Sequence, residues 1–221
     1  MKKIISFILA GLLLICLFSI SACTTGRAQD EEENDPDELK LTFIDVGKGD
    51  AILIEKDGTN ILVDTGYEET AETVISFLEN EGIDHLDHLI ISHYDKDHVG
   101  GAAKIAEAFE IGQIYLPDYE GESKYYSSFM KAISKYGLSY LRVSEDITLE
   151  FSGVTLVIYA SDVEYEPGTD GDEGNDNDVS LVTAVYYGED SYLLAGDIEK
   201  KGIKSYLKKD AGQFDVIKMP H

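Results

Sequence analysis

Four side chains that commonly bind metal ions fall within six consecutive positions of the chain. The segment 92–101 reads Ser-His-Tyr-Asp-Lys-Asp-His-Val-Gly-Gly and contains His93, Asp95, Asp97 and His98. Two imidazoles and two carboxylates at this density are costly to hold together without a cation, because neighbouring carboxylates repel and unpaired charge is unfavourable where water is excluded. The cluster therefore predicts a metal site. The alternative is a polar loop whose charges pair with one another.

The elements around this cluster predict a layered α/β domain. The β-prone run 86–92 precedes it and Gly100-Gly101 closes it, so we expect the cluster on a loop that leaves a buried strand. Other strands are expected at 41–46, 51–56, 60–64, 113–116, 139–143, 147–151, 154–159, 180–187, 192–195 and 214–219, and helices at 69–81, 102–109, 123–136 and 199–207. Helices inserted between groups of strands predict two sheets faced by helices.

The first 38 residues have the composition of a targeting segment followed by a tether. Met1-Lys2-Lys3 precedes an apolar run at 4–22, which is typical of a secretory signal. Ile20-Ser21-Ala22-Cys23 resembles a bacterial lipobox, in which the cysteine is diacylated and becomes the mature N-terminus. We therefore expect a lipoprotein signal peptide at 1–22, an acidic disordered tether at 23–38 and a domain at 39–221. Lipidated Cys23 would hold this domain at the extracytoplasmic face of the cell membrane, and an uncleaved anchor is the alternative.

The chain is strongly acidic. It has 43 Asp and Glu against 18 Lys and Arg, a net charge of −25. Such a surface repels polyanions, so broad contact with nucleic acid is disfavoured. A nucleic-acid substrate would have to be drawn in by bound metals and a few local lysines.

The motif at 93–101 resembles the metal motif of the metallo-β-lactamase fold hydrolases. More narrowly, it is similar to the ComEC/Rec2-like competence-protein branch and to the phosphorylcholine esterases of cell walls. Five further segments match that branch in order, at 43–50, 62–66, 177–182, 194–198 and 216–221. The resemblance covers nearly all of 41–221. It implies an αββα sandwich, in which two mixed sheets face each other and helices lie outside.

The resemblance also implies two divalent metal ions, zinc or manganese, and it assigns their ligands. The first ion would be bound by His93 and Asp95, the second by Asp97, His98 and His221, and both by a bridging Asp197. Asp95 stands where the family usually has a histidine, and this oxygen ligand suits manganese as well as zinc. The alternative role of Asp197 is a helix N-cap ahead of Glu199.

The third ligand of the first ion lies in a short polar stretch before residue 180. Asp178 is the expected ligand, and Asn177 either takes this place or shapes the turn. Asp64 is expected to hold the loops under the metals rather than to bind them. Asp45 and Asp50 are expected to shape turns and to hydrogen-bond around the ligands.

The activity implied by the resemblance is metal-dependent hydrolysis of a phosphate mono- or diester. Two cations would share a hydroxide and lower its pKa, and this hydroxide would attack phosphorus. Asp97, as the catalytic residue, would orient the hydroxide or pass a proton to the leaving group. A small-molecule or cell-wall phosphoester is the expected substrate, and a competence-type DNA nuclease is the alternative.

The end of the printed sequence departs from the family pattern. Relatives continue with Pro-His-His-Gly-Ser, a strand and a helix, whereas the sequence ends at His221. We therefore expect a C-terminally truncated domain in which the last strand or helix is missing. A catalytically impaired binding domain is the second alternative.

Overall fold

The computed structural model describes residues 38–168, 174–209 and 212–220. The signal peptide expected at 1–22 and the tether expected at 23–38 lie outside the described residues, except for Glu38. Within the described ranges, no helix is both long and apolar enough to cross a membrane.

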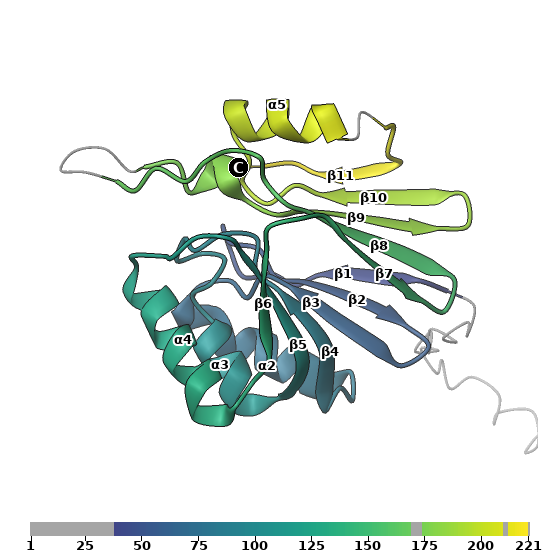
Figure 1. Cartoon of the computed structure of the whole chain (residues 1–221). Coiled ribbons are helices and arrows are strands. Elements are labelled where there is room, and N and C mark those ends of the chain that lie inside the picture. Colours follow the sequence, from purple (N-terminus) through teal and green to yellow (C-terminus); the bar gives the residue numbers. More distant parts are fainter. Residues whose placement is uncertain (1–37, 169–173, 210–211, 221) are drawn as a thin grey trace, which may run out of the picture. The chain divides into compact units, whose positions relative to one another are not determined.

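The first sheet of the described chain has six strands in sequence order (Figure 1). They are β1 (Lys40–Phe43), β2 (Ile52–Lys56), β3 (Thr59–Val63), β4 (His85–Ile90), β5 (Glu110–Pro117) and β6 (Tyr140–Val143). The first three form an antiparallel meander, whose second turn has positive φ at Asp57 and Gly58, as a tight hairpin requires. From β3 to β6 the strands run parallel, so the loops that follow them all leave the sheet at the carboxyl ends of these strands.

Three helices connect the parallel strands and cover the same outer face of the first sheet (Figure 1). They are α2 (Ala71–Asn80), preceded by the 3-10 turn η1 (Glu68–Thr70), α3 (Ala102–Ala108) and α4 (Lys124–Tyr136). Helix α4 begins where Ser123 Oγ accepts a hydrogen bond from Tyr126 N at 3.1 Å, and it ends at Gly137, whose φ of 65° suits a left-handed cap.

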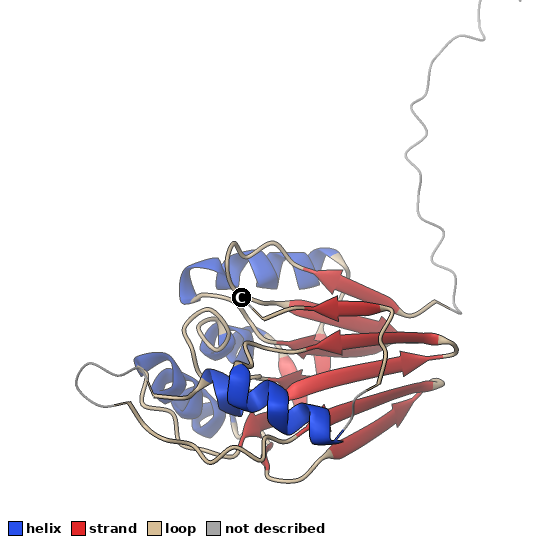
Figure 2. Cartoon of the chain, turned by 90° about the horizontal axis from the view of Figure 1, so that it is seen from above, coloured by secondary structure: helices blue, strands red, loops and turns tan. Residues whose placement is uncertain are grey.

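The second sheet has the order β11-β10-β9-β8-β7 in the described residues. Its strands are β7 (Ile147–Phe151), β8 (Val154–Tyr159), β9 (Val182–Tyr187), β10 (Asp190–Leu194) and β11 (Val216–Lys218). Strand β9 follows the 3-10 turn η2 (Asn177–Val179). The pairing is antiparallel except between β10 and β11, which α5 (Lys200–Lys209) connects. Seen from above, α5 lies over this sheet (Figure 2).

Alternating side chains divide the core into three apolar layers. Ile52 and Ile54 of β2 pack between the sheets, whereas Leu53 packs toward the helices. In the same way, Leu194 of β10 faces the first sheet and Leu193 faces α5. Each fully buried aliphatic side chain contributes roughly 1.5–3 kcal/mol. The layers are helix, sheet, sheet and helix, which confirms the predicted αββα sandwich.

Candidate metal centre

The loops that follow β1, β3 and β4 are joined by backbone hydrogen bonds at one edge of the first sheet. Asp50 N donates to Asp97 O at 3.1 Å, and both the N and Oγ1 of Thr65 donate to His98 O at 2.8 Å. Gly49 allows the first of these contacts, because a Cβ at this position would overlap the Asp97 carbonyl. The loop with the predicted ligands is therefore held in place by its neighbours.

Asp64 lies beneath this loop and orients His98. Its carboxylate accepts hydrogen bonds from Ser92 N (2.7 Å) and Ser92 Oγ (2.6 Å), and Oδ2 lies 2.8 Å from His98 Nδ1. Burial raises the pKa of Asp64, but the charge of His98 and the hydrogen bonds outweigh burial and lower it. Because Nδ1 of His98 is engaged here, Nε2 is directed toward the other sheet. Asp64 therefore holds His98 in place, and its predicted exclusion from the metal ligands stays a prediction.

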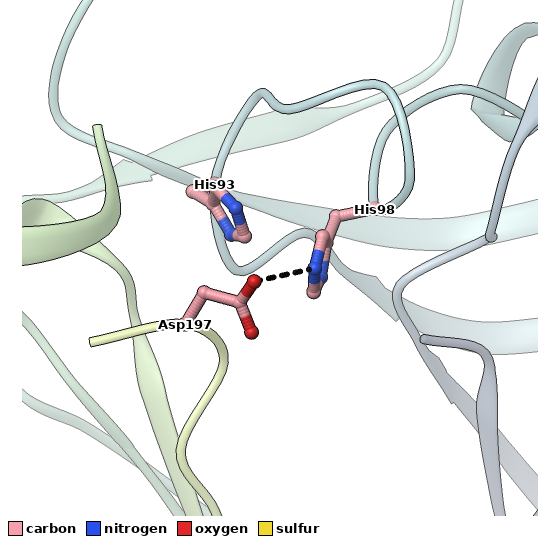
Figure 3. Close-up of side chains that lie close together, drawn as sticks. All are labelled: His93, His98 and Asp197. Carbon is pink, nitrogen blue, oxygen red and sulfur yellow. Dashed lines mark ion pairs between the residues drawn. The ribbon is translucent and has the colours of Figure 1, made fainter. Parts of the chain in front are cut away.

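His93, His98 and Asp197 come together where the two sheets meet (Figure 3). One ligand atom of each lies within 4.8 Å of the others. Asp197 follows β10, and its Oδ2 lies 3.3 Å from His98 Nε2. The two imidazole rings are 4.1 Å apart between centroids. Both histidines are fully buried and Asp197 is 6% exposed, so the group is closed off from bulk water.

The surroundings favour opposite protonation states for the two imidazoles. Burial and the charge of His98 lower the pKa of His93 to about 3, so this ring is neutral, the form that binds metals. Burial also lowers the pKa of His98, but the Asp64 and Asp197 carboxylates outweigh it and raise that pKa to about 10. Burial raises the pKa of Asp197, yet the hydrogen bond and charge from His98 hold it well below its usual range. A cation at His98 Nε2 would therefore displace a proton.

The donor atoms of this cluster fit a divalent metal ion. His93 Nε2 is buried and has no hydrogen-bond partner among the described residues. An unpaired buried nitrogen is unfavourable unless it has a ligand, and imidazole with carboxylate suits zinc or manganese. A second group of three, Asp50, Asp64 and His98, also satisfies the distance for a metal site.

Asp95 and Asp97 lie beside this cluster but belong to neither group of three. Asp95 Oδ2 is 3.8 Å from His93 Nε2, and half of the Asp95 side chain is exposed. Burial and the charges of Asp176 and Asp97 raise the pKa of Asp95 to about 6. Asp97 Oδ2 accepts a long hydrogen bond from Tyr67 Oη at 3.5 Å. Both carboxylates face the cavity described below.

Asp178 caps a helix in the structure. Its Oδ1 accepts hydrogen bonds from Lys201 N and Gly202 N, each at 2.8 Å, at the start of α5. Asn177 Nδ2 donates to Glu199 Oε1 at 3.3 Å. The role of Asp178 as a metal ligand thus stays a prediction, as does that of His221, which lies outside the described residues.

A cavity of about 500 Å³ opens beside the cluster. It is lined by residues 94–97 of the loop after β4, which carries the predicted ligands and is called the ligand loop below, by the start of α4 and by the segment 174–178. Its charged lining residues are Asp95, Lys96, Asp97, Asp176, Asp178 and Glu199. The cavity is large enough for a small phosphoester, and its lining is strongly acidic.

Two residues for which the sequence predicted no role, Ser92 and Lys218, lie in the cluster. Ser92 Oγ lies 3.0 Å from His93 Nδ1 and donates to Asp64. Lys218 Nζ contacts the carboxylates of Asp50 and Asp197. The signal for Lys218 was a cation in the β-prone run 214–219, three residues before the predicted ligand His221.

A buried histidine–carboxylate cluster at the junction of an αββα sandwich defines a class of metal-binding domain. The model of the "Metallo-beta-lactamase superfamily" matches residues 44–218. The chain belongs to this superfamily, whose members are typically hydrolases.

Curated relatives include three proteins named for recombination or competence. "Recombination protein 2" of Haemophilus influenzae is 32% identical over 187 residues, which cover 82% of this chain and 21% of that protein. "ComE operon protein 3" of Bacillus subtilis is 23% identical, with 83% and 25% covered. "Competence protein ComA" of Neisseria gonorrhoeae is 27% identical, with 80% and 22% covered. The chain thus spans about a fifth to a quarter of these relatives.

Solved structures show the same fold at low sequence identity. A metallo-β-lactamase with a HARLDQ motif from Cronobacter sakazakii has a TM-score of 0.56 at 14% identity, covering 82% of this chain and 74% of that one. The metallo-β-lactamase fold protein YhfI from Bacillus subtilis has a TM-score of 0.54 at 15% identity, covering 81% and 69%. At this identity the likeness concerns the fold alone.

Proposed function

We propose that the chain is an extracytoplasmic hydrolase that uses divalent metal ions, zinc or manganese, to cleave phosphate mono- or diesters. The observation that carries this proposal is the buried group of His93, His98 and Asp197 beside an open cavity of about 500 Å³. The group offers two nitrogens and a carboxylate, and Asp95 and Asp97, from the same loop as the two histidines, line the cavity.

The residues of the chain prepare the site in distinct ways. His93 is held neutral by burial, and His98 is oriented by Asp64 through a 2.8 Å contact. When bound, divalent ions would supply a nucleophile at neutral pH and neutralise charge that develops on the phosphoryl oxygens. Asp97 lines the cavity, which supports a role in orienting water or in carrying a proton to the leaving group.

Turnover of bis-p-nitrophenyl phosphate tests this proposal. The purified domain should lose activity on chelation and regain it with Mn²⁺ or Zn²⁺. His93→Ala and Asp197→Ala should abolish activity, whereas His85→Ala, at an exposed histidine away from the cavity, should not. Activity that survives both chelation and His93→Ala would contradict the proposal. Metal uptake without turnover would instead favour a binding domain.

A DNA nuclease is the second candidate, because the relatives are named for recombination and competence. The net charge of −25 and the acidic lining of the cavity count against it. Incubation of single- and double-stranded DNA with the metal-loaded protein separates the two candidates. Degradation that depends on His93 would favour the nuclease over a small or cell-wall phosphoester substrate.

The proposed location depends on the N-terminal sequence. Cys23 ends a lipobox-like tetrapeptide at the end of an apolar run, which supports lipid attachment at this residue. Labelling with a radioactive fatty acid should mark the full-length protein in bacterial cells, and Cys23→Ala should remove the label. Equal labelling of both forms would argue against a lipid anchor at Cys23.

A further inference from the structure

Lys218 ends β11 and directs its ammonium group into the metal cluster. Nζ forms an ion pair with Asp50 Oδ2 and lies 3.5 Å from Asp197 Oδ1 and 3.3 Å from the Gly196 carbonyl. The side chain of Lys218 is 12% exposed, that of Asp50 11% and that of Asp197 7%. The three charges therefore lie together away from bulk water, where ion pairs are less screened.

The two carboxylates that Lys218 contacts come from different sheets. Asp50 lies on the loop between β1 and β2, and Asp197 follows β10. Strands β10 and β11 run parallel, so Asp197 and Lys218 leave the second sheet at the same end. One lysine thus joins the ligand-bearing end of the second sheet to the loops of the first.

The two oxygens of Asp197 have different surroundings. Oδ1 faces Lys218 Nζ, whereas Oδ2 lies 3.3 Å from His98 Nε2 on the side of the two imidazoles. A carboxylate with neither oxygen restrained can bind a cation through one oxygen or chelate it through both. An ammonium against Oδ1 favours binding through one oxygen, because chelation would draw Oδ1 away from the lysine.

We propose that Lys218 is a positioning residue, which holds Oδ1 of Asp197 so that the carboxylate presents only Oδ2 to a cation bound by His93 and His98. If Asp197 bridges two ions, it then does so through Oδ2. This inference rests on the metal site proposed above, but not on the reaction assigned to it.

The visible absorption spectrum of bound Co²⁺ tests the role of Lys218 without any turnover. The intensity of Co²⁺ bands falls as its coordination number rises. Lys218→Met keeps an unbranched side chain and removes the charge, so it releases Oδ1 for chelation. We expect weaker, shifted bands in this variant and Co²⁺ affinity lower by about 10- to 100-fold, as for other residues that orient ligands. Lys218→Arg keeps the charge and should retain most of the wild-type spectrum.

A double variant separates positioning from a purely structural role. Lys218→Met leaves Asp50 buried without its cation, and Asp50→Asn removes that unpaired charge. The pair Lys218→Met with Asp50→Asn should therefore regain stability to urea, while its Co²⁺ spectrum stays like that of Lys218→Met. The double variant also provides a folded protein if the single variant is too unstable to purify.

Three outcomes can be distinguished. Weaker bands in both Met variants support the role of Lys218. A wild-type spectrum in both Met variants overturns that role and leaves the metal site standing. Failure of the wild-type protein to take up Co²⁺ overturns the metal site, and the inference with it.

Discussion

At the scale of single residues, the centre depends on side chains that set the orientation and charge of other side chains. Asp64 holds a φ of 58°, a left-handed conformation uncommon outside glycine, while it accepts hydrogen bonds from Ser92 and contacts His98. Such strain is maintained only where the surroundings fix the residue strongly, as the buried Ser92 and His98 do here. Replacement of Asp64 or Ser92, which position other side chains, should therefore weaken metal binding even though neither is a predicted metal ligand.

Asp64→Asn should lower the affinity for Zn²⁺ or Mn²⁺ by about 10- to 100-fold, because the amide removes the charge that orients His98. Calorimetric titration measures this affinity, and circular dichroism checks that the variant is folded. Asp45→Asn is the matched control, since Asp45 is exposed and its Oδ1 accepts a hydrogen bond from Gly47 N, two residues along the chain. Equal affinities in the Asp64 and Asp45 variants would show that Asp64 has no orienting role.

The two histidines should make the stability of the metal-free protein peak near pH 6.5, the ordinary pKa of histidine. Below that pH the unfolded chain protonates His93, whose folded pKa is about 3, so stability falls with decreasing pH. Above it the folded protein retains the proton of His98, whose pKa is about 10, so stability falls as pH rises toward 10. Each histidine contributes a slope of at most about 1.4 kcal/mol per pH unit.

Urea unfolding in the presence of chelator, from pH 4.5 to 10, measures this profile. The stability of wild type relative to His93→Asn should fall as pH decreases below 6.5, and its stability relative to His98→Asn should fall as pH increases above 6.5. Differences that do not vary with pH would contradict the assigned protonation states.

At the scale of elements, glycines and a capped helix bring the loops together. Gly49 lies so close to the Asp97 carbonyl that a Cβ would overlap it. Asp178 connects the segment before β9 to the first turn of α5 through two hydrogen bonds. The ligand loops thus owe their position to contacts between elements rather than to their own sequence.

Gly49→Ala should reduce both stability and metal affinity, because the loop after β1 would be pushed from the ligand loop. Gly58→Ala is the matched control: its φ of 81° makes alanine strained, by roughly 1–2 kcal/mol, but no atom lies within 4 Å of the added Cβ. We expect thermal unfolding to shift down in both variants and metal affinity to fall only in Gly49→Ala. A similar metal affinity in both variants would show that the contact between Gly49 and the Asp97 carbonyl does not position the ligands.

Asp178→Ala should lower the free energy of unfolding by about 0.5–2 kcal/mol through loss of the cap, whereas Asp178→Asn should keep most of it. Urea denaturation of the two variants measures the difference. The Asn variant also tests the predicted ligand role, because an amide caps well but binds cations poorly. If Asp178→Asn keeps the wild-type stability but loses metal affinity about tenfold, Asp178 binds the metal as well as capping α5.

The elements were more predictable from the sequence than the contacts of the site. The β-prone run at 51–56 predicts a strand, which is present as β2, and the helix expected at 69–81 is present as η1 and α2. The close spacing of His93 and His98 predicted that they share a site. The contact of Lys218 with Asp50 depends on how two sheets pack, and the cap formed by Asp178 depends on where α5 begins. Neither is a local property of the chain.

At the scale of the whole molecule, the metal centre joins two sheets of separate sequence. His93 and His98 leave the first sheet, and Asp197 leaves the second. An ion bound by all three would therefore stabilise the packing of one sheet on the other. Because the unfolded chain lacks this arrangement, binding energy adds to folding stability.

A metal ion whose free concentration is a hundred times its dissociation constant should raise the free energy of unfolding by about 2.7 kcal/mol. Thermal unfolding with and without Zn²⁺ or Mn²⁺ measures this increment. Asp197→Asn should lose most of it, because the second sheet would no longer supply a charged ligand. An increment that is unchanged in this variant would mean that the ion binds elsewhere.

The order of the strands also makes the domain divisible. The first sheet uses only residues up to Val143 and the second only residues from Ile147 onward, with exposed Ser144 and Glu145 in the connection between them. A nick in this connection would yield two polypeptide halves, each with one of the two described sheets and the helices that cover it. Reassembly of the halves in solution would regenerate the centre, and cation uptake would then report the moment at which they meet.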